Sequence, residues 1–585
     1  MLGKRSDQRG LFEADYLYLD FVGRDSFYGF LASQRGQLFR DEEFAALYVL
    51  DNGRHSVPPS LLATALLLQT YDRVSDEDAK EHADFDLRWK VALGIALDAR
   101  PFAKSTLQVF RAQLILHEEV RAVFKKSLTV ARQTGYFKQR KIKVALDTSN
   151  ILGRGAVKDT YNLLADGIVK LGRVLAEFSG ETADAWADAH DLSRYFGTSS
   201  LKGEAHIDWS DAKARQTFLQ SIVADAERLL EMARQTLSTH EAESSEHKTL
   251  TEAAELLGQL LLQDITRTPD GVCIKDGVSH DRVISVHDPE MRHGRKSKAK
   301  RFDGHKAAVA VDPESQLITA VDVLAGNAPD CEHALELVEQ TEENAQVEVD
   351  ETIGDCAYGD GTTRQEFADA GRKLVAKVPD RPNSGQIPKE DFRIDLKAKT
   401  CTCPAGQECQ TLELIGRRTD RNGESREQLG FKFGPEVCAA CARRADCVRA
   451  GPGKGRTVSL HPQEALLQEA RALQRSEAFG PYRQQRQAAE HRLARLMQLG
   501  TRQARYFGRV KTLYQLLMAA AVANLTLVAT KVGRMRCRRR RRSHSSAPTI
   551  GAVAVFISAF VLSVVCCLGL TGHSPARRPG FHPGF

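Results

Sequence analysis

The N-terminus lacks the run of apolar residues that a secretory signal peptide requires. Its opening segment, MLGKRSDQRGLFEADY, carries scattered charges instead. We therefore expect the protein to remain in a reducing compartment, the cytoplasm, where disulfide bonds are rare. Six of the twelve cysteines fall within the 47 positions 401–447, and this cluster is then better interpreted as metal binding than as a set of disulfides.

Acidic residues are missing from the C-terminal segment. After Thr530 the chain has ten Lys and Arg and no Asp or Glu, which leaves 72 basic and 76 acidic residues before that point. The net charge of +6 therefore comes from the tail and carries no information on partners of the rest. Any DNA site has to be a local basic patch.

A phosphate-binding loop is also missing. The segment GPGKGRT at 451–457 looks similar, but Gly455 follows the lysine where such a loop needs Ser or Thr. The sequence therefore gives no indication of an ATPase.

The length of 585 residues predicts two to four domains. Residues 55–135 favour helices, since SVPPSLLATALLLQTYDRV begins with Ser and Pro and continues with apolar residues at helical spacing. Short helices around DARPFAKS suit either a helix-turn-helix that meets DNA or a small bundle packed on the next domain. Residues 1–138 are thus predicted to form a helical, DNA-binding N-terminal domain.

Strand patterns begin after that domain. KIKVALDTSNILG alternates apolar and polar residues and predicts a strand that stops at Asp147. A charged helical insertion follows at about 160–280. Strands return at 282–325, first in RVISVHDPE and then in a hairpin through FDGHKAAVAVDPESQLITAVDVLAG.

The second half of the chain adds one more strand and two helical segments. QVEVDETIGDCAYG predicts a strand that ends in Asp355, and a Cys-rich insertion follows at about 398–450. Residues 462–498 predict a long amphipathic helix or a helix pair, and TLYQLLMAAAVANLTLVA predicts a buried helix. The predicted fold class is α/β, with a second domain spanning 139–535.

Three acidic residues occupy key positions in these elements. Asp147 and Asp355 end predicted strands, and Glu490 lies on a predicted helix one turn after Arg486. Two strand carboxylates and one from a packed helix can hold two divalent cations, and oxygen ligands suit Mg²⁺ or Mn²⁺. Such a pair of cations can activate water and stabilise the leaving oxygen of a phosphodiester. Taken singly, each Asp also fits a turn or cap residue, and Arg486–Glu490 fits an exposed ion pair.

Several motifs in this order resemble a known family. VALDTSNILGRGAVKDTYNLLADGI, KRFDGHKAAVAVD, IGDCAYGDG and the R-x3-E of Arg486 and Glu490 look like a bacterial insertion-sequence transposase of the DDE class, nearest to the IS-eleven-eighty-two group. The resemblance covers about residues 15–530. It implies a ribonuclease-H-like mixed sheet flanked by helices, with the helical and Cys-rich segments as insertions.

The resemblance also implies an activity. Asp147, Asp355 and Glu490 would be the catalytic ligands of two Mg²⁺ or Mn²⁺ ions. The implied reaction is metal-dependent cleavage of double-stranded DNA at terminal inverted repeats, followed by attack of the freed 3′ hydroxyls on target DNA. A homodimer is expected because two ends are handled together, and the expected location is the bacterial cytoplasm, with the nucleoid.

Four residues are candidate DNA contacts. Tyr482 and Arg486 share one predicted helix face with the catalytic glutamate. The family signature places the Tyr three residues before the Arg, whereas here the spacing is four, and a Lys expected seven places after the Glu is Met497. Lys306 and Lys511 are further candidates for phosphate contacts, and the alternative for each is a solvated surface lysine.

The Cys-rich segment has enough thiols for a structural Zn²⁺ site. The preferred ligand set is Cys403, Cys438, Cys441 and Cys447. Unligated thiols are the alternative, and Cys401 and Cys409 leave the choice of four open. The isolated cysteines Cys273, Cys331 and Cys356 are expected to be buried.

The tail at 536–585 is Arg-rich and then hydrophobic. GAVAVFISAFVLSVVCCLGL is long enough for a membrane span, but the resemblance ends before it, which favours a non-native extension over a membrane segment. Two other functions remain open for the whole chain. One is a DNA-binding protein without catalysis, and the other is a metal-dependent nuclease without strand transfer.

Overall fold

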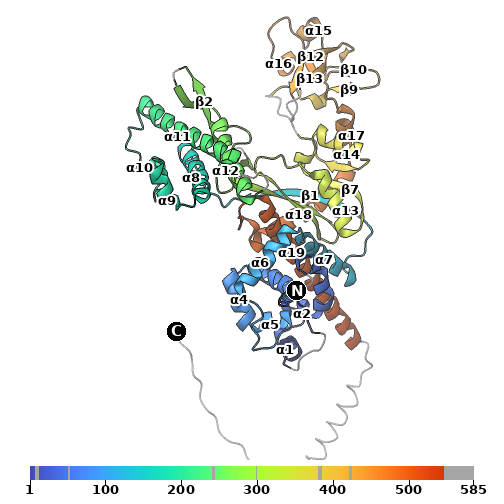
Figure 1. The fold of residues 1–585 in the computed structure, drawn as a ribbon. Helices are drawn as coiled ribbons and strands as arrows, with labels where there is room; N and C mark the ends of the chain where they lie inside the picture. The colour runs from blue at the N-terminus through green and yellow to red at the C-terminus, as the bar shows by residue number, and fades with distance from the viewer. Residues whose placement is uncertain are drawn as a thin grey trace, which may run out of the picture. The chain divides into compact units, whose positions relative to one another are not determined.

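A computed structural model describes residues 1–6, 12–49, 53–239, 244–269, 271–297, 299–379, 385–419 and 425–545. The chain divides into a unit of Met1–Val528 and a second unit that begins at Ala529 (Figure 1). The hydrophobic tail segment predicted at 551–570 lies outside the described residues.

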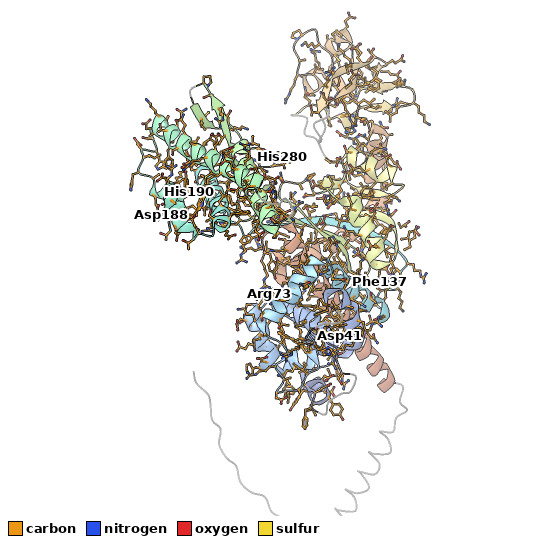
Figure 2. The ribbon with its side chains drawn as sticks, in the orientation of Figure 1. Asp41, Arg73, Phe137, Asp188, His190 and His280 are labelled. Atoms are coloured by element: carbon orange, nitrogen blue, oxygen red, sulfur yellow. The ribbon has the colours of Figure 1, made fainter. Side chains whose placement is uncertain are left out.

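The N-terminal part is a bundle of helices. They are α1 (Ala14–Val22), α2 (Phe27–Leu38), η1 (Asp41–Leu47), α3 (Pro59–Asp72), α4 (Asp76–Phe85), α5 (Leu87–Leu93), α6 (Lys104–Leu116) and α7 (Val120–Gln133). Side chains of Ser26, Ser75 and Asp86 cap α2, α4 and α5. Buried Asp41, labelled in Figure 2, accepts hydrogen bonds from the backbone N–H groups of Arg5 at 2.8 Å and Ser60 at 2.9 Å.

The contacts of this bundle correspond to the second alternative for the N-terminal domain, which is a small bundle packed on the next domain. Helix α5 packs against α1 to α4, and α6 packs against α3 and α4. Helix α7 packs against α13 (Ala334–Ala345), where Lys125 pairs with Glu343 at 2.6 Å. The Arg132 guanidinium also donates to the Ala345 carbonyl. The bundle is therefore joined to the following domain by packing and by charged contacts.

The central element of the following domain is a mixed sheet of six strands. They are β1 (Lys141–Leu152), β4 (Arg292–Arg295), β5 (Arg301–Val311), β6 (Ile318–Ala325), β7 (Glu348–Gly354) and β8 (Leu374–Ala376). The order is β4-β5-β1-β7-β8, with β6 also paired to β5. Strand β1 runs antiparallel to β5 and parallel to β7, and β7 runs parallel to β8. The predicted mixed α/β class is confirmed.

Two predicted strand boundaries are wrong. Strand β1 does not stop at Asp147 but continues to Leu152, because β5 pairs with it as far as Gly304. RVISVHDPE forms no strand: Val283 packs into the helical insertion, and its backbone N–H and C=O bond to the side chain of Gln263 instead of a neighbouring strand. The apolar alternation there reflects burial without sheet pairing.

Helices α13, α14 (Gly361–Asp369), α18 (Gly480–Leu496) and α19 (Arg509–Ser545) contact the sheet. Helix α17 (Glu464–Arg475) packs against α14. Helix α18 packs against β1, β5 and β7, and a π turn at Met497–Thr501 follows it. The predicted helix pair at 462–498 is therefore present as α17 and α18, and the predicted buried helix is the first part of α19.

The apolar part of α19 belongs to the hydrophobic core of the protein. Among the described residues, Arg509–Arg534 is the one helical segment long and apolar enough to cross a membrane, yet 67% of its apolar window is buried inside the protein. Asn524 is a fully buried polar residue of this helix: its amide accepts from Ile318 N–H at 2.9 Å and donates to Ile318 C=O at 2.8 Å and Ser127 Oγ at 3.2 Å. These bonds tie α19 to β6 and α7.

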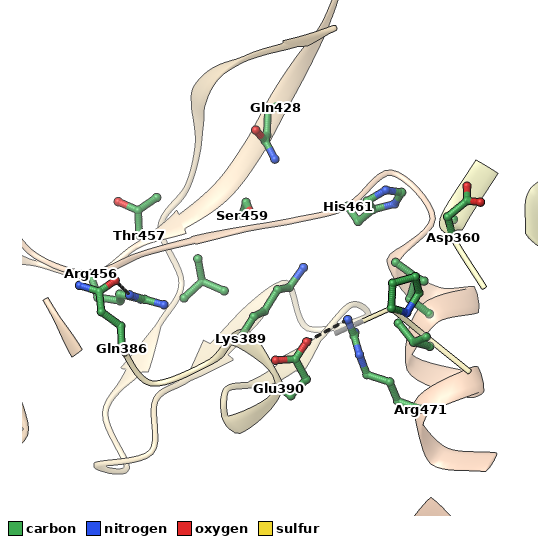
Figure 3. Close-up of a pocket in the computed structure, with 15 residues that line it drawn as sticks. Asp360, Gln386, Lys389, Glu390, Gln428, Arg456, Thr457, Ser459, His461 and Arg471 are labelled. Carbon is green, nitrogen blue, oxygen red and sulfur yellow. Dashed lines mark hydrogen bonds and ion pairs between the residues drawn. The ribbon is translucent and has the colours of Figure 1, made fainter. Parts of the chain in front are cut away.

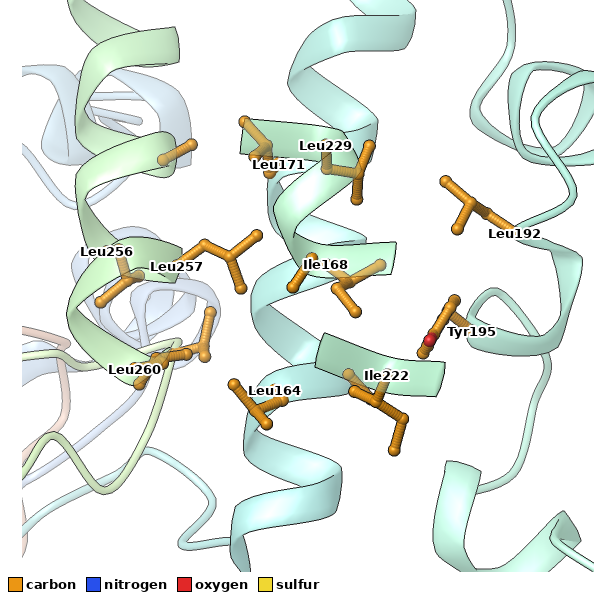
Figure 4. Packing of buried hydrophobic residues seen from close by; sticks show 14 of the residues in the cluster. Leu164, Ile168, Leu171, Leu192, Tyr195, Ile222, Leu229, Leu256, Leu257 and Leu260 are labelled. Atoms are coloured by element: carbon orange, nitrogen blue, oxygen red, sulfur yellow. The ribbon is translucent and has the colours of Figure 1, made fainter. Parts of the chain in front are cut away.

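The helical insertion has its own core. It contains α8 (Thr160–Ser179), α9 (Ala183–Ala189), η2 (Ser193–Tyr195), α10 (Leu201–Glu204), α11 (Ala212–Thr239), α12 (Ser245–Asp264) and the hairpin β2 (Ile265–Thr268) and β3 (Gly271–Ile274). Ile168, Ile222 and Leu257 from the three long helices meet in this core (Figure 4). The apolar residues recur at helical spacing, so each long helix buries one face.

Two small sheets and two short helices make up the Cys-rich segment. They are β9 (Arg393–Asp395), β10 (Thr400–Thr402), β11 (Glu408–Cys409), β12 (Leu412–Thr419), β13 (Ser425–Lys432), α15 (Pro435–Ala439), α16 (Arg444–Cys447) and β14 (Thr457–Ser459). Their small core is built on Phe392, Phe431 and Phe433, together with buried cysteines.

We expect Leu257→Ala to lower the free energy of unfolding by about 2–5 kcal/mol, because Leu257 is fully buried and its truncation leaves a cavity. The measurement is the urea midpoint of the helical-insertion transition. Leu262→Ala on the same helix is the matched control, since Leu262 is 76% exposed and should change stability by less than about 0.5 kcal/mol. Equal effects of the two substitutions would contradict this packing.

Candidate active site

Asp147 and Asp355 lie side by side on two parallel strands. Ala145 on β1 is paired with Ile353 on β7, and two residues further along each strand come Asp147 and Asp355. Asp355 follows the last residue of β7 and caps the turn η3 (Cys356–Tyr358), accepting the Ala357 N–H at 2.8 Å. Asp147 lies inside β1, half-buried, and its Oδ1 accepts the Thr148 N–H at 2.8 Å.

Helix α18 brings the third predicted residue to the same place. It packs against β1, and Glu490 on it forms an ion pair of 2.5 Å with Arg486. Burial raises the pKa of Asp147, the negative charges of Asp355 and Glu490 act in the same direction, and the Thr148 N–H and Arg486 oppose them, so that the pKa is about 6. Asp147 is therefore within range of the charges of the other two carboxylates.

The negative charge of Asp147, Asp355 and Glu490 suits the binding of a cation. A half-buried carboxylate with a raised pKa gains most from a nearby positive charge, and oxygen donors match Mg²⁺ or Mn²⁺. As the side chains stand, however, no group of three or more His, Cys, Asp or Glu among the described residues is arranged to hold a metal ion. In this arrangement it is Arg486 that partly balances the acidic charge.

Tyr482 is engaged elsewhere. Its hydroxyl donates to the Glu351 carboxylate, with Oε atoms at 3.0 and 3.1 Å, and Lys143 lies 4.9 Å from the centre of its ring. Lys143 and Lys373 also pair with Glu351. Tyr482 thus fastens the start of α18 to β7, while Arg486 faces the carboxylates.

The two lysines that are candidates for phosphate contacts differ in their exposure. Lys306 on β5 is buried, and its ammonium donates to the Ala328 carbonyl at 2.5 Å and to Asp330 at 2.7 Å. It is therefore not a solvated surface lysine. Lys511, in the first turn of α19, is exposed.

One buried residue next to the acids had no role in the sequence analysis. Tyr358 ends the η3 turn three residues after Asp355, and it is 1% exposed. It lies within IGDCAYGDG, but a tyrosine in a motif is equally typical of a core residue, so nothing in the sequence distinguished it.

The six clustered cysteines separate into two groups. Cys401 and Cys409 face each other across β10 and β11. The other four line one cavity of about 30 Å³ together with apolar side chains, and they are Cys403, Cys438, Cys441 and Cys447. The backbone N–H of Arg456 donates to the Cys438 sulfur at 3.4 Å.

The expectation for the isolated cysteines holds only in part. Cys331 is buried, but Cys273 is half-buried and Cys356 is exposed. Cys356 follows Asp355 at the mouth of β7, where a turn rather than core packing surrounds it.

A polar cavity of about 400 Å³ lies next to the Cys-rich segment (Figure 3). Lys389, Arg456, His461 and Arg471 bring basic groups to it, and Arg471 pairs with Glu390 at 3.3 Å. None of the predicted site residues is among the side chains that line it. The three acids therefore lie outside this cavity, on β1, at the end of β7 and on α18.

Comparison with known families assigns the chain to a class of protein. Residues 20–113 match a family described as a transposase domain, and residues 402–529 match the transposase DDE domain. The second match includes Arg486, Glu490 and the four cysteines of the small cavity, whereas Asp147 and Asp355 lie outside both matches. A search of the curated proteins and of the solved structures found no match.

The chain thus carries two segments that match transposase domains. The second of them, at 402–529, matches the DDE type of transposase domain.

We expect Glu351→Gln to destabilise the protein in a pH-dependent way. Burial raises the pKa of Glu351, but hydrogen bonds from Lys143, Lys373 and Tyr482 outweigh it and hold the pKa at about 2. Because the folded pKa is depressed, this carboxylate stabilises the protein above the unfolded pKa of about 4.3, and the contribution is lost as pH falls toward about 2.

Urea midpoints at about pH 7 should show a loss of about 1–2 kcal/mol, and the loss should shrink at about pH 3. Glu348→Gln on the same strand is the control, because Glu348 is exposed and its pair with Lys141 contributes little. A loss that is equally large at both pH values would contradict the assigned pairing.

Proposed function

We propose that the protein cleaves double-stranded DNA at the ends of an insertion sequence and joins the freed 3′ ends to target DNA. The observation that carries this proposal is the pairing of Ala145 with Ile353, which sets Asp147 and Asp355 side by side beneath the helix of Glu490. The strand order also supports a ribonuclease-H-like core, because β6, β5 and β1 are antiparallel neighbours and β7 and β8 continue in parallel.

Asp147, Asp355 and Glu490 are the proposed ligands of two Mg²⁺ or Mn²⁺ ions. When bound, such ions activate the attacking hydroxyl and stabilise the leaving oxygen of the phosphodiester. Glu490 has to leave Arg486 to take part, since the two are paired at 2.5 Å. The released guanidinium is then free to hold a DNA phosphate beside the carboxylates.

The proposed DNA partners are the terminal inverted repeats and the target duplex, handled by a homodimer in the bacterial cytoplasm. Exposed Lys511 is a direct candidate for a phosphate contact. Lys306 would first have to exchange Asp330 for a phosphate, and Tyr482 contributes by anchoring α18 to Glu351. The helical residues 1–138 are the proposed end-binding domain, and 139–535 the catalytic domain. The IS-eleven-eighty-two group is the proposed subgroup.

We expect Asp147→Asn, Asp355→Asn and Glu490→Gln each to lower cleavage by about 100-fold or more, because each removes a charge that holds the metal ions. The assay incubates full-length protein and DNA carrying candidate terminal repeats with Mg²⁺ or Mn²⁺. Asp350→Asn, an exposed residue of β7, is the control and should retain wild-type activity.

The products separate the candidate functions. Cleavage with joining supports the transposase, and cleavage without joining indicates a nuclease. A band shift without cleavage by wild-type protein indicates a DNA-binding protein that has lost catalysis, and would refute the proposed chemistry.

We also propose a structural Zn²⁺ held by Cys403, Cys438, Cys441 and Cys447. The support is that these four thiols line one small cavity. Cys401 and Cys409 do not line it, and they lie opposite each other on strands β10 and β11. Zinc prefers four thiolate ligands and would join the β10 end of the segment to α15 and α16. The pKa of Cys447 is raised by burial and by the neighbouring thiols, which is the situation that a bound cation relieves.

Protein purified without chelators should contain about one Zn²⁺ per chain by elemental analysis, and Cys441→Ser should lose it. Removal of zinc from the wild type should lower its melting temperature toward that of Cys441→Ser. Cys409→Ser is the matched control, because Cys409 lies outside the small cavity. Zinc retained by Cys441→Ser, or absent from wild type, would contradict the site.

A further inference from the structure

The polar cavity of about 400 Å³ beside the Cys-rich segment has no part in the proposed chemistry (Figure 3). Its volume lies in the range of small-ligand sites. Its lining offers hydrogen-bond donors of several kinds: the guanidinium of Arg456, the ammonium of Lys389, the hydroxyls of Thr457 and Ser459, and the amide of Gln428. Donors of this number and kind suit an anion that has several oxygen atoms.

Arg456 is a cation of this cavity whose charge is not balanced by an acid. Its guanidinium donates to three neutral acceptors, which are Gln386 Oε1 at 2.9 Å, the Cys447 carbonyl at 2.8 Å and the Ile387 carbonyl at 3.0 Å. In the part of the chain that the structure describes, Arg456 forms no ion pair, and its buried Nε has no hydrogen-bond partner. A half-buried guanidinium in this state is stabilised by a nearby anion.

The other long basic side chains of the lining are already neutralised. Lys389 pairs with Glu464 at 2.5 Å, and Arg471 pairs with Glu464 at 3.4 Å and with Glu390 at 3.3 Å. The acid Asp360 lies at the opposite end of the cavity from Arg456, where its side chain caps helix α14 (Figure 3). Excess positive charge therefore remains at the Arg456 end.

The backbone at the Arg456 end is held by close packing. A Cβ added to Gly455 would lie 1.9 Å from the Phe433 carbonyl oxygen, and the Arg456 carbonyl accepts the Phe433 N–H at 2.9 Å. The next residue, Thr457, lines the cavity and is exposed, so this end meets the solvent. The donors are thus positioned before a ligand arrives.

The segment that leads to Arg456 is strongly basic. Residues 443–456 contain five Lys and Arg and one acid, Asp446. Arg443, Arg449 and Lys454 of this segment are exposed. A local patch of this kind attracts a polyanion such as nucleic acid.

DNA at the three acids would extend as far as this cavity. Asp360, which lines the cavity, follows Asp355 by five residues. Five residues of chain span at most about 18 Å. Each DNA strand carries a phosphate about every 3.4 Å along the helix axis, so a duplex at the acids reaches the Asp360 wall of the cavity within about five base pairs.

We propose that the polar cavity binds a phosphate group of the DNA backbone through Arg456 and the donors beside it, at a place separate from the three carboxylates. The inference rests on the proposed function for the identity of the ligand, because a free nucleotide presents the same phosphate chemistry. The contact holds the duplex and takes no part in bond cleavage.

The test measures binding of full-length protein to fluorescently labelled duplex DNA that carries candidate terminal repeats, without added divalent metal and at several salt concentrations. Thr457→Glu adds a carboxylate to the lining, which opposes a phosphate there. Its dissociation constant should rise by about 10-fold, and the slope of log K against log salt should fall by about 1 in magnitude. Thr457→Gln has the same size without the charge and should bind within about 2-fold of wild type.

Two further variants control for charge and folding. Gln410→Glu adds the same charge at an exposed position of the same segment outside the cavity lining, and screening by salt should leave its affinity and slope unchanged. Gln428→Glu is an isosteric change at a second lining position, and it should weaken DNA binding even if Thr457→Glu lowers the melting temperature. Lining variants that bind DNA as tightly as Gln410→Glu would refute the site.

Calorimetry with ATP and with inorganic phosphate, in the absence of DNA, separates the sources of the phosphate group. If Thr457→Glu abolishes binding of either compound but leaves DNA affinity unchanged, the cavity takes a free phosphate compound and the DNA contact is overturned.

Addition of Mg²⁺ separates failure of this inference from failure of the proposed function. Wild-type protein that cleaves and joins DNA, with unchanged DNA affinity in both lining variants, refutes the cavity alone. Wild-type protein that binds DNA without cleaving it, with weaker binding by both lining variants, supports the cavity and refutes the proposed chemistry.

Discussion

The parallel pairing of β1 with β7 is the constraint on which the candidate site depends. The two strands come from distant parts of the sequence, and their register is set where Ala145 meets Ile353. Both residues are buried, so the register is held by packing on the sheet faces as well as by backbone hydrogen bonds. A slip of one residue would turn one aspartate to the opposite face and separate the two carboxylates.

The charges around Asp147, Asp355 and Glu490 are the second constraint on the candidate site. Asp147 and Asp355 are half-buried and Glu490 is exposed, and the effect of the negative charges of Asp355 and Glu490 on Asp147 is opposed by Arg486. In the middle of β7, four residues before Asp355, Glu351 is balanced by two lysines and a tyrosine hydroxyl and keeps its charge. The middle and the end of β7 therefore differ: the charge of Glu351 is neutralised by its neighbours, whereas excess negative charge remains beside Asp355.

The sequence identified the three acids and most of the elements that carry them, because strand alternation and helical spacing report which face is buried. It missed the continuation of β1 beyond Asp147, since pairing to β5 through Gly304 is a long-range effect. It could not tell that Lys306 is committed to Asp330, because this pairing depends on tertiary contacts. The four cysteines that it preferred are the four that line the small cavity, although the spacing alone left the choice of four open. The burial of Tyr358 after Asp355 is likewise visible only when its neighbours are in place.

The order of these elements along the chain has a consequence for protein synthesis. The strands that carry both aspartates are complete by Gly354, but α18 follows only after the entire Cys-rich segment has been translated. Domains generally fold as they leave the ribosome, from the N-terminus onward. A nascent chain, or one shortened by an early stop codon before α18, can therefore assemble the N-terminal bundle and most of the sheet while lacking the third carboxylate. Such a product would carry Asp147 and Asp355 without Glu490, so the candidate site is complete only in chains that are translated past α18.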